Sequence, residues 1–388
     1  DAVDTGPGPQ DAAERTEVRS AVAAGLQALS EDHRQVLVLR EIQGLSYEEI
    51  AGVLEVDLGT VNTLVAIRGQ GIVLREPTVV TVRAGNKQEV LSVGQEAIQL
   101  LGRTPGSVNV CYPMREGVIC DGPLCEAMLK HYIRRAWGRK IGPLGVRLML
   151  CLPLCITDIE RRAMVDAAKA AGAREVLLME EPVAAALGAG VSPMDPMGNM
   201  VVDIGGGTTD AAVLALGGIA AHRSIRVGGT HIDEAIVAYI REEYELTIGG
   251  RTAEQLKLAL GRAQVGGIEH CEVRGRNLKT GLPASVVVGQ REIGHAIVEP
   301  LRKIAQAVRE TLSETPPELA GDILERGLIL TGGGALLSGM GAMLSRDTGL
   351  PVRVAEDPLD CVVLGALKGL DLRDDVPEGL YSDMTMEA

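Results

Sequence analysis

Apolar residues near the start of the chain recur with the spacing of an amphipathic helix. Val18, Val22 and Leu26 follow one another at steps of four residues, so a helix would place them on one face. Similar spacing continues up to residue 54, whereas the stretch before it is rich in Gly, Pro, Asp and Ala. The pattern predicts a disordered tail at residues 1–13 and a helical segment at residues 14–54.

After residue 54 the helical periodicity gives way to short apolar runs that are interrupted by glycines. The runs at residues 64–67 and 72–74 flank a Gly-Gln-Gly sequence, which is typical of two strands joined by a turn. Farther on, apolar runs at residues 147–152 and 175–179 flank a helical pattern at residues 157–171. Strands that alternate with helices indicate an α/β architecture.

One short motif occurs twice, once in each half of the chain. Asp57, Gly59 and Thr60 form an Asp-x-Gly-Thr sequence at the end of one apolar run. Asp203 begins a similar Asp-x-Gly-Gly-Gly-Thr sequence at the end of another, and a second apolar run follows each motif. The repeat indicates a duplicated domain with a cleft between the two copies.

The residue types in this motif suit the binding of a polyphosphate. Glycine permits a positive φ and lets backbone N–H groups come close to an anion, and threonine adds a hydroxyl donor. An aspartate at a strand end can hold a hydrated Mg²⁺ ion. A single copy would be typical of a hairpin with a polar turn, but two copies favour a pair of turns that clamp a triphosphate. The chain has no Walker sequence, which excludes P-loop binding.

Composition and charge limit the classes of function. The 388 residues are 46% hydrophobic and 23% charged, which is typical of a globular protein of two or three domains. The formal net charge of −14 argues against a general nucleic-acid binder, because phosphate backbones bind to basic surfaces. The longest apolar run, near residues 146–156, is far shorter than the ~20 residues of a membrane span. We therefore expect a cytoplasmic protein.

Taken together, the motifs resemble those of the actin, Hsp70 and sugar-kinase ATPase superfamily and, more narrowly, the MreB-type bacterial actin homologues. The resemblance extends from about residue 54 to about residue 369 and implies an actin-like (RNase H-like), duplicated, two-lobed α/β fold with a nucleotide cleft. The implied domains are lobe I at residues 55–195 (small subdomain about 81–124), lobe II at 196–361 (small subdomain about 232–295), and a return to lobe I at 362–388 that ends in an acidic tail. The matching stretches are residues 57–63, 69–77, 101–106, 180–182, 201–209, 248–257, 326–337 and 355–359.

The resemblance implies a catalytic group for ATP hydrolysis. Glu181 would orient or deprotonate the attacking water, with Thr208 and Asp203 assisting. A carboxylate suits this role, because phosphoryl transfer needs positioning and charge neutralisation more than covalent help. Glu180 is the alternative base, and the Glu181-Pro182 sequence also fits a solvated helix start.

The resemblance also implies which residues hold ATP and Mg²⁺. Asp57 and Asp203 would hold the metal, largely through waters. Glu254 and Lys257, one helical turn apart, would face the nucleoside, although the pair also fits an exposed ion pair. The remaining nucleotide-binding residues would lie in three glycine-rich turns: Asp57, Gly59, Thr60, Val61 and Asn62 in the first, Gly205, Gly206 and Gly207 in the second, and Gly332, Gly333 and Gly334, beside the adenine, in the third.

The function implied by the resemblance is that of an ATP-binding, filament-forming cytoskeletal ATPase that maintains rod cell shape by organising cell-wall synthesis. Slow, Mg-dependent hydrolysis would be coupled to polymerisation. The partners would be further copies of the chain, cell-shape membrane proteins and the inner membrane surface. Trp137, Ile141 and Leu144 fit either a membrane anchor or an ordinary polar loop. The alternative is a soluble kinase or chaperone-type ATPase of the same superfamily.

The front of the chain resembles a different family. Residues 26–61 are similar to region 4 of an extracytoplasmic-function sigma factor, in which Leu58–Val61 would open the DNA-recognition helix. The same residues belong to the first phosphate turn, and we expect the turn because about 300 further residues pack around it. DNA binding through these helices remains an alternative, although residues 1–56 hold 4 Arg and no Lys against 11 acidic residues.

Overall fold

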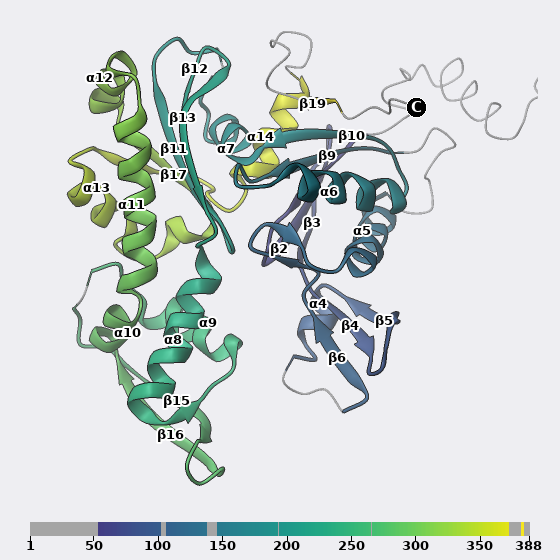
Figure 1. Ribbon diagram of the computed structural model, residues 1–388, viewed down its shortest axis with the longest axis vertical. Helices are drawn as coiled ribbons and strands as arrows, with labels where there is room; N and C mark the ends of the chain where they lie inside the picture. The colour runs from purple at the N-terminus through teal and green to yellow at the C-terminus, as the bar shows by residue number, and fades with distance from the viewer. Residues whose placement is uncertain are drawn as a thin grey trace, which may run out of the picture.

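The computed structural model describes residues 53–101, 106–137, 146–192, 194–264, 266–371 and 382–383 (Figure 1). The predicted tail at residues 1–13, nearly all of the helical segment at 14–54, residues 140–144 and most of the acidic C-terminal end lie outside the described residues. The predictions made for those segments therefore stay predictions.

The first large sheet combines an antiparallel meander with parallel strands. Its strand order is β19-β10-β9-β1-β2-β3, in which β1, β2 and β3 are antiparallel neighbours and β9 and β10 lie parallel to β1. The strand–turn–strand pattern and the strand–helix alternation predicted from the sequence are confirmed. The strands are β1 (Val53–Leu58), β2 (Asn62–Ile67), β3 (Gly71–Pro77), β9 (Val146–Leu152), β10 (Ala173–Glu180) and the short β19 (Ser382–Asp383).

The second large sheet repeats this topology. Its order is β13-β12-β11-β17-β18, again with three antiparallel neighbours followed by strands parallel to the first of them. The duplication that the repeated Asp-x-Gly motif predicted is therefore present in the strand order. The strands are β11 (Asn199–Ile204), β12 (Thr209–Ala215), β13 (Gly218–Ile225), β17 (Leu328–Thr331) and β18 (Val352–Val354).

Each large sheet carries its own helices and a small sheet, and we call these two assemblies lobe I and lobe II. Figure 1 shows them side by side, with α7 and α14 between them. Lobe I has α4 (Gln95–Ile98), α5 (Gly122–Trp137), α6 (Asp158–Ala170), the sheet of β4 (Val80–Arg83), β5 (Asn86–Val93) and β6 (Val108–Cys111), and the hairpin of β7 (Met114–Arg115) and β8 (Val118–Ile119).

Lobe II is the larger assembly in the described part of the chain. It contains α8 (Gly229–Tyr244), α9 (Gly250–Leu260), α10 (Gln290–Ala296), α11 (Val298–Glu314), α12 (Pro317–Arg326), the 3₁₀-helix η1 (Gly333–Leu336), α13 (Met340–Thr348), and the small sheet of β14 (Leu246–Thr247), β15 (His270–Asn277) and β16 (Pro283–Gly289). The two helices between the lobes are α7 (Glu181–Gly188) and α14 (Cys361–Asp371).

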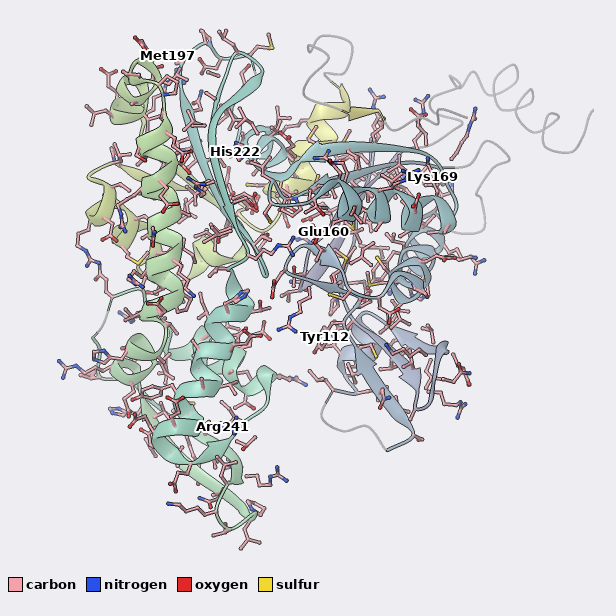
Figure 2. The ribbon with its side chains drawn as sticks, in the orientation of Figure 1. Tyr112, Glu160, Lys169, Met197, His222 and Arg241 are labelled. Carbon is pink, nitrogen blue, oxygen red and sulfur yellow. The ribbon has the colours of Figure 1, made fainter. Side chains whose placement is uncertain are left out.

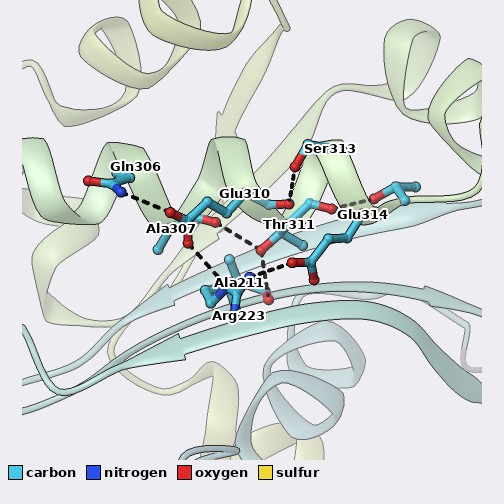
Figure 3. A network of polar contacts seen from close by, with 9 residues as sticks. Ala211, Arg223, Gln306, Ala307, Glu310, Thr311, Ser313 and Glu314 are labelled. Carbon is cyan, nitrogen blue, oxygen red and sulfur yellow. Dashed lines mark hydrogen bonds and ion pairs between the residues drawn. The ribbon is translucent and has the colours of Figure 1, made fainter.

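Aliphatic residues and methionine fill the cores, because the chain has no phenylalanine. Polar contacts also connect helix α11 to the second sheet (Figure 3). Thr311 Oγ1 donates to Ala307 O at 3.0 Å and to Ala211 O at 3.5 Å, and Arg223 of β13 forms ion pairs with Glu310 (3.2 Å) and Glu314. These contacts fix β12 and β13, which follow the second glycine-rich turn.

Among the described residues, none of the helices has both the length and the apolar character that crossing a bilayer requires.

Candidate functional site

The first predicted phosphate turn joins β1 to β2. Leu58 pairs with Thr63 across the two antiparallel strands, so the residues between them form a tight turn and not a helix. This confirms the prediction that the turn would prevail over a sigma-type recognition helix. A Cβ on Gly59 would lie 2.5 Å from Asn62 O, so a side chain cannot be accommodated there, and Thr78 Oγ1 holds the turn by donating to Gly59 O at 2.7 Å. The side chain of Asn62 itself is exposed.

The second predicted turn joins β11 to β12 in the same way. Gly205 N donates to Thr208 O at 2.9 Å, which closes the turn. The N-terminus of α8 packs against it, because Gly229 N donates to Gly205 O (3.0 Å) and Thr230 N to Gly206 O (2.8 Å). The first residues of a long helix therefore lie next to a turn with the composition of an anion-binding loop.

The structure brings the two turns into direct contact, although they come from different lobes. A Cβ on Gly206 would lie 2.6 Å from Val61 Cγ2, and a Cβ on Gly207 would overlap Thr60 Oγ1. The Thr60 hydroxyl accepts a hydrogen bond from Gly117 N at 2.9 Å, at the tip of the β7–β8 hairpin. The opposed turns that the repeated motif predicted thus face each other, with the side chains of Val61 and Thr60 in the first turn against Gly206 and Gly207 in the second.

Two carboxylates lie behind these turns. Burial raises the pKa of Asp57 to about 7, and the charge of Asp203 adds to this rise. Burial also raises the pKa of Asp203 to about 6, although Thr331 Oγ1 donates to its Oδ1 at 2.8 Å. A divalent cation would relieve the repulsion between these two groups, and carboxylate oxygens are the ligands that Mg²⁺ prefers.

The donor set fits a metal that keeps most of its water shell. No group of three or more His, Cys, Asp or Glu side chains in the part of the chain that the structure describes is arranged to hold a metal ion. Two carboxylates with waters and phosphate oxygens are a common arrangement for Mg²⁺, which gives up its waters reluctantly. The residues present are therefore compatible with Mg²⁺ that arrives together with a nucleotide.

Glu181 is the first residue of α7 and is only 9% exposed. Its pKa lies well above the usual range because of burial, to which the charges of Asp210, Asp57 and Asp203 add. The alternative interpretation of a solvated helix start is wrong. A buried carboxylate with a raised pKa has the character of a general base.

The two residues predicted to face the nucleoside, Lys257 and Glu254, differ in their surroundings. Lys257 of α9 forms an ion pair with Asp233 Oδ2 of α8 at 2.9 Å and donates to Gly229 O at 3.2 Å, at the start of the helix that packs on the second turn. The alternative of an exposed pair with Glu254 is therefore wrong for Lys257. Glu254 is exposed. Burial raises the pKa of Tyr112 in lobe I, and the negative charge of Glu254 raises it further. Figure 2 shows Tyr112 on the side of lobe I that faces lobe II.

The third glycine cluster packs against the second turn. Gly332 has φ 77° and donates its N–H to Pro358 O at 2.8 Å, and a Cβ there would lie 2.7 Å from Asp203 Oδ1. A Cβ on Gly334 would overlap the side chain of Ile204, whereas Gly333 has more room, with Leu359 Cδ2 at 3.3 Å. The cluster predicted to lie beside the adenine is thus adjacent to Asp203.

Sequence reasoning missed three contributors to this site. Thr331 supports Asp203, the β7–β8 hairpin supports Thr60, and Asp210 is a further buried carboxylate. Asp210 could have been found, because an Asp at the second position after the turn pairs with Asp203 in an antiparallel hairpin. The other two depend on contacts between segments far apart in the sequence.

The family profile of the MreB/Mbl proteins matches residues 51–377, and that of sigma-70 region 4 matches residues 19–66. The cell shape-determining protein MreB of Escherichia coli (strain K12) is 48% identical over 334 residues, which are 85% of this chain and 96% of that protein.

Two solved structures share the fold. The crystal structure of MreB 5 of Spiroplasma citri bound to AMPPNP is 35% identical with a TM-score of 0.78, over 84% of this chain and 98% of that one. A chain of the MamK double helical filament is 22% identical with a TM-score of 0.67, over 84% and 99% of the two chains. The fold predicted from the sequence, actin-like and α/β, is confirmed.

Proposed function

The chain belongs to the MreB/Mbl family, and we propose that it is an actin-like cytoskeletal protein that binds ATP, forms filaments and maintains rod cell shape by organising cell-wall synthesis. The observation that carries this proposal is the direct contact of two glycine-rich turns, one from each lobe, next to the buried Asp203 and the half-buried Asp57. The structural relative with bound AMPPNP supports the binding of a nucleotide.

The residues of the site suggest how ATP would be bound and hydrolysed. The backbone N–H groups of the turns at residues 59–61 and 205–207, with the hydroxyls of Thr60 and Thr208, would donate hydrogen bonds to the phosphates. Asp57 and Asp203 would hold Mg²⁺, which when bound supplies positive charge to the phosphate oxygens. Glu181 would orient the attacking water and accept its proton, since burial raises the pKa of this carboxylate and makes it more basic. Lys257 and Glu254 would face the nucleoside, beside Gly332–Gly334.

Filament assembly would be coupled to ATP binding and hydrolysis through the relative position of the two lobes. Because each lobe supplies one turn, binding of a nucleotide between the turns favours one relative position of the lobes. Further copies of the chain are the proposed main partner, and cell-shape membrane proteins and the inner membrane surface the additional ones. We also propose the lobe limits given above, with lobe I at residues 55–195, lobe II at 196–361 and a return to lobe I at 362–388.

The sigma-type likeness supports no second function in the described residues. Residues 53–66 of that match form β1, the first turn and most of β2, so the segment that would read a DNA groove is not helical. A gel shift with promoter DNA on the full chain tests this directly. Retardation at physiological salt would show that the front segment binds DNA despite its negative charge.

Sedimentation with nucleotide tests the main proposal. The full chain is expected to pellet in Mg·ATP and to release phosphate slowly, whereas ADP release that depends on an added sugar, without release of free phosphate, would favour a kinase. Asp203→Ala removes one of the two aspartates behind the turns and is expected to weaken ATP binding at least tenfold. Calorimetric titration with Mg·ATP measures this, and unchanged binding in Asp203→Ala would refute the site.

A further inference from the structure

Helix α5 and strand β5 form an open pocket in lobe I, and Figure 1 shows both elements on the side of this lobe away from lobe II. Val90 and Val93 of β5 line one side of the pocket. Four basic residues of α5 line the other: Lys130, His131, Arg134 and Arg135. No acidic residue of the described chain belongs to the lining, and the proposed function gives this pocket no role.

Much of the positive charge in this pocket is not neutralised within the described part of the chain. Arg135 forms an ion pair with Glu76, but its side chain is still 51% exposed. Lys130 and Arg134 are exposed, and neither forms an ion pair with another described residue. They lie four residues apart on α5, where like charges repel each other. An anion that binds between them relieves this repulsion, so the pocket fits a negatively charged ligand.

The chain itself contains a segment of the required charge. Residues 1–17, which we call the acidic front stretch, hold five acidic residues against one basic residue, Arg15, and so have a formal charge of −4. The acidic residues are Asp1, Asp4, Asp11, Glu14 and Glu17. Between them lie small apolar residues, Ala2, Val3, Ala12 and Ala13, which suit the valine side of the pocket.

The chain is long enough for the acidic front stretch to reach the pocket. Helix α5 contacts β2 and β3, and β2 pairs with β1, which begins at Val53. One strand length and one helix layer place the pocket on the order of 30 Å from Val53. The chain from Glu17 to Val53 advances 36 positions (53 − 17), which would span about 54 Å even as a continuous helix.

The acidic C-terminal end is less well placed for this pocket. Its residues Ser382 and Asp383 form β19, which pairs with β10. In the order β19-β10-β9-β1-β2-β3, this strand lies at one edge of the sheet, whereas β3, which α5 contacts, lies at the other. Among the acidic segments of the chain, the front stretch is therefore the better candidate.

We propose that the acidic front stretch binds in the basic pocket of α5 within the same chain. Its carboxylates pair with Lys130 and Arg134, and its alanine and valine side chains pack against Val90 and Val93. Single exposed ion pairs are weak, but attachment to the same chain gives the stretch a high effective concentration at the pocket. The bound stretch keeps other anionic partners from these side chains. This inference does not depend on the proposed ATPase function.

Cross-linking of the full chain with a water-soluble carbodiimide tests the contact, because this reagent joins a lysine amine to a carboxylate that touches it. Lys130 is expected to be cross-linked to an acidic residue within residues 1–17, as identified by peptide mass spectrometry. Arg134→Glu should lower the yield at least fivefold, and so should about 0.5 M NaCl, since salt screens exposed charges. Arg162→Glu, at an exposed position of α6, is the matched control and should change the yield less than twofold.

The inference would be overturned if Lys130 formed no cross-link with residues 1–17, or if Arg134→Glu left the yield unchanged. A mixture of isotope-labelled and unlabelled chains shows whether the contact lies within one chain. Cross-links that join a labelled to an unlabelled chain would assign the pocket to a second copy and refute the intramolecular contact. Cosedimentation with phosphatidylglycerol vesicles that Arg134→Glu abolishes, without a cross-link to residues 1–17, would assign the pocket to a lipid surface instead.

Discussion

At the scale of single residues, the site depends on glycines, which have no side chain. The two turns meet because Gly206 and Gly207 present no side chains to Val61 and Thr60. Gly207 also approaches the backbone at Glu116, where an added Cβ would lie 2.7 Å from the Cα atom. Backbone atoms in such a contact cannot easily shift to make room for a side chain. The close approach of the two lobes therefore requires glycine at these positions.

Gly207→Ala is therefore expected to separate the turns. The added methyl group would displace Thr60 and the tip of the β7–β8 hairpin, at a cost of about 1–3 kcal/mol in the free energy of unfolding. ATP affinity should fall at least tenfold, as measured by calorimetric titration, along with the urea midpoint. Gly218→Ala is the control, because the nearest atom to a Cβ there is 4.0 Å away. Equal ATP affinity in the two variants would contradict the contact between the turns.

Individual residues also show what the sequence could predict. Asp57 and Asp203 were predicted as neighbours because their motif is repeated, and the repeat is visible without any structure. The contacts of Asp210 with Leu154 and of Thr60 with Gly117 join residues 56 and 57 positions apart. No local pattern encodes such pairs, since they follow from how the sheets and hairpins are stacked.

At the scale of elements, the start of α6 links local capping to the contact between lobes. Thr157 is the N-cap, and its N–H and hydroxyl both donate to Glu160 Oε2 at 2.9 Å, while Glu160 N donates to Thr157 Oγ1. The same Glu160 carboxylate accepts two hydrogen bonds from Arg226 of lobe II, each at 2.9 Å. One side chain thus stabilises a helix end and holds it against the other lobe.

Glu160→Gln tests the charged part of this contact. The hydrogen bond from Thr157 N and the guanidinium of Arg226 lower the pKa of Glu160, so its contribution to stability is present above the unfolded pKa of about 4.5 and is lost as the pH falls. Glutamine can still cap the helix. The variant should be less stable than wild type by about 0.5–1 kcal/mol at pH 7, since the side chain is a quarter exposed, and by less at pH 4. Urea denaturation at both pH values measures this, and a deficit that grows at pH 4 would contradict it.

The elements around the first turn show why local likeness can mislead. Residues 58–61 resemble the start of a recognition helix, yet they form the end of β1 and a turn. β1 pairs with β2 on one side and β9 on the other, and Leu54 and Val56 are buried in the core of lobe I. The burial of a central strand outweighs a helical preference that amounts to tenths of a kcal/mol per residue. The sequence favoured the turn because about 300 further residues were expected to pack around it.

At the scale of the whole molecule, α7 and α14 connect the lobes. Their backbones are in close contact: a Cβ on Gly188 would lie 2.6 Å from Cys361 Cα, and one on Gly365 would lie 2.6 Å from Ala184 C and 2.7 Å from Gly188 N. A third core lies here, in which Val183 and Ala184 of α7 pack with Val201 of the second sheet and Met149 of the first. Because Glu181 is the first residue of α7, the helix that joins the lobes also carries the proposed base.

Gly365→Ala is expected to affect both stability and the site. The methyl group would force α14 away from α7, which should lower the free energy of unfolding by about 1–3 kcal/mol and move Glu181 with its helix. Chemical denaturation measures the first effect and phosphate release from Mg·ATP the second, which should fall more than ATP affinity does. Gly321→Ala is the matched control in α12, because a Cβ there meets no atom within 4 Å, and it should raise stability by about 0.5–1 kcal/mol. If both variants gained stability, the helices would have room to separate, and the close contact between α7 and α14 could not be what fixes the position of the lobes.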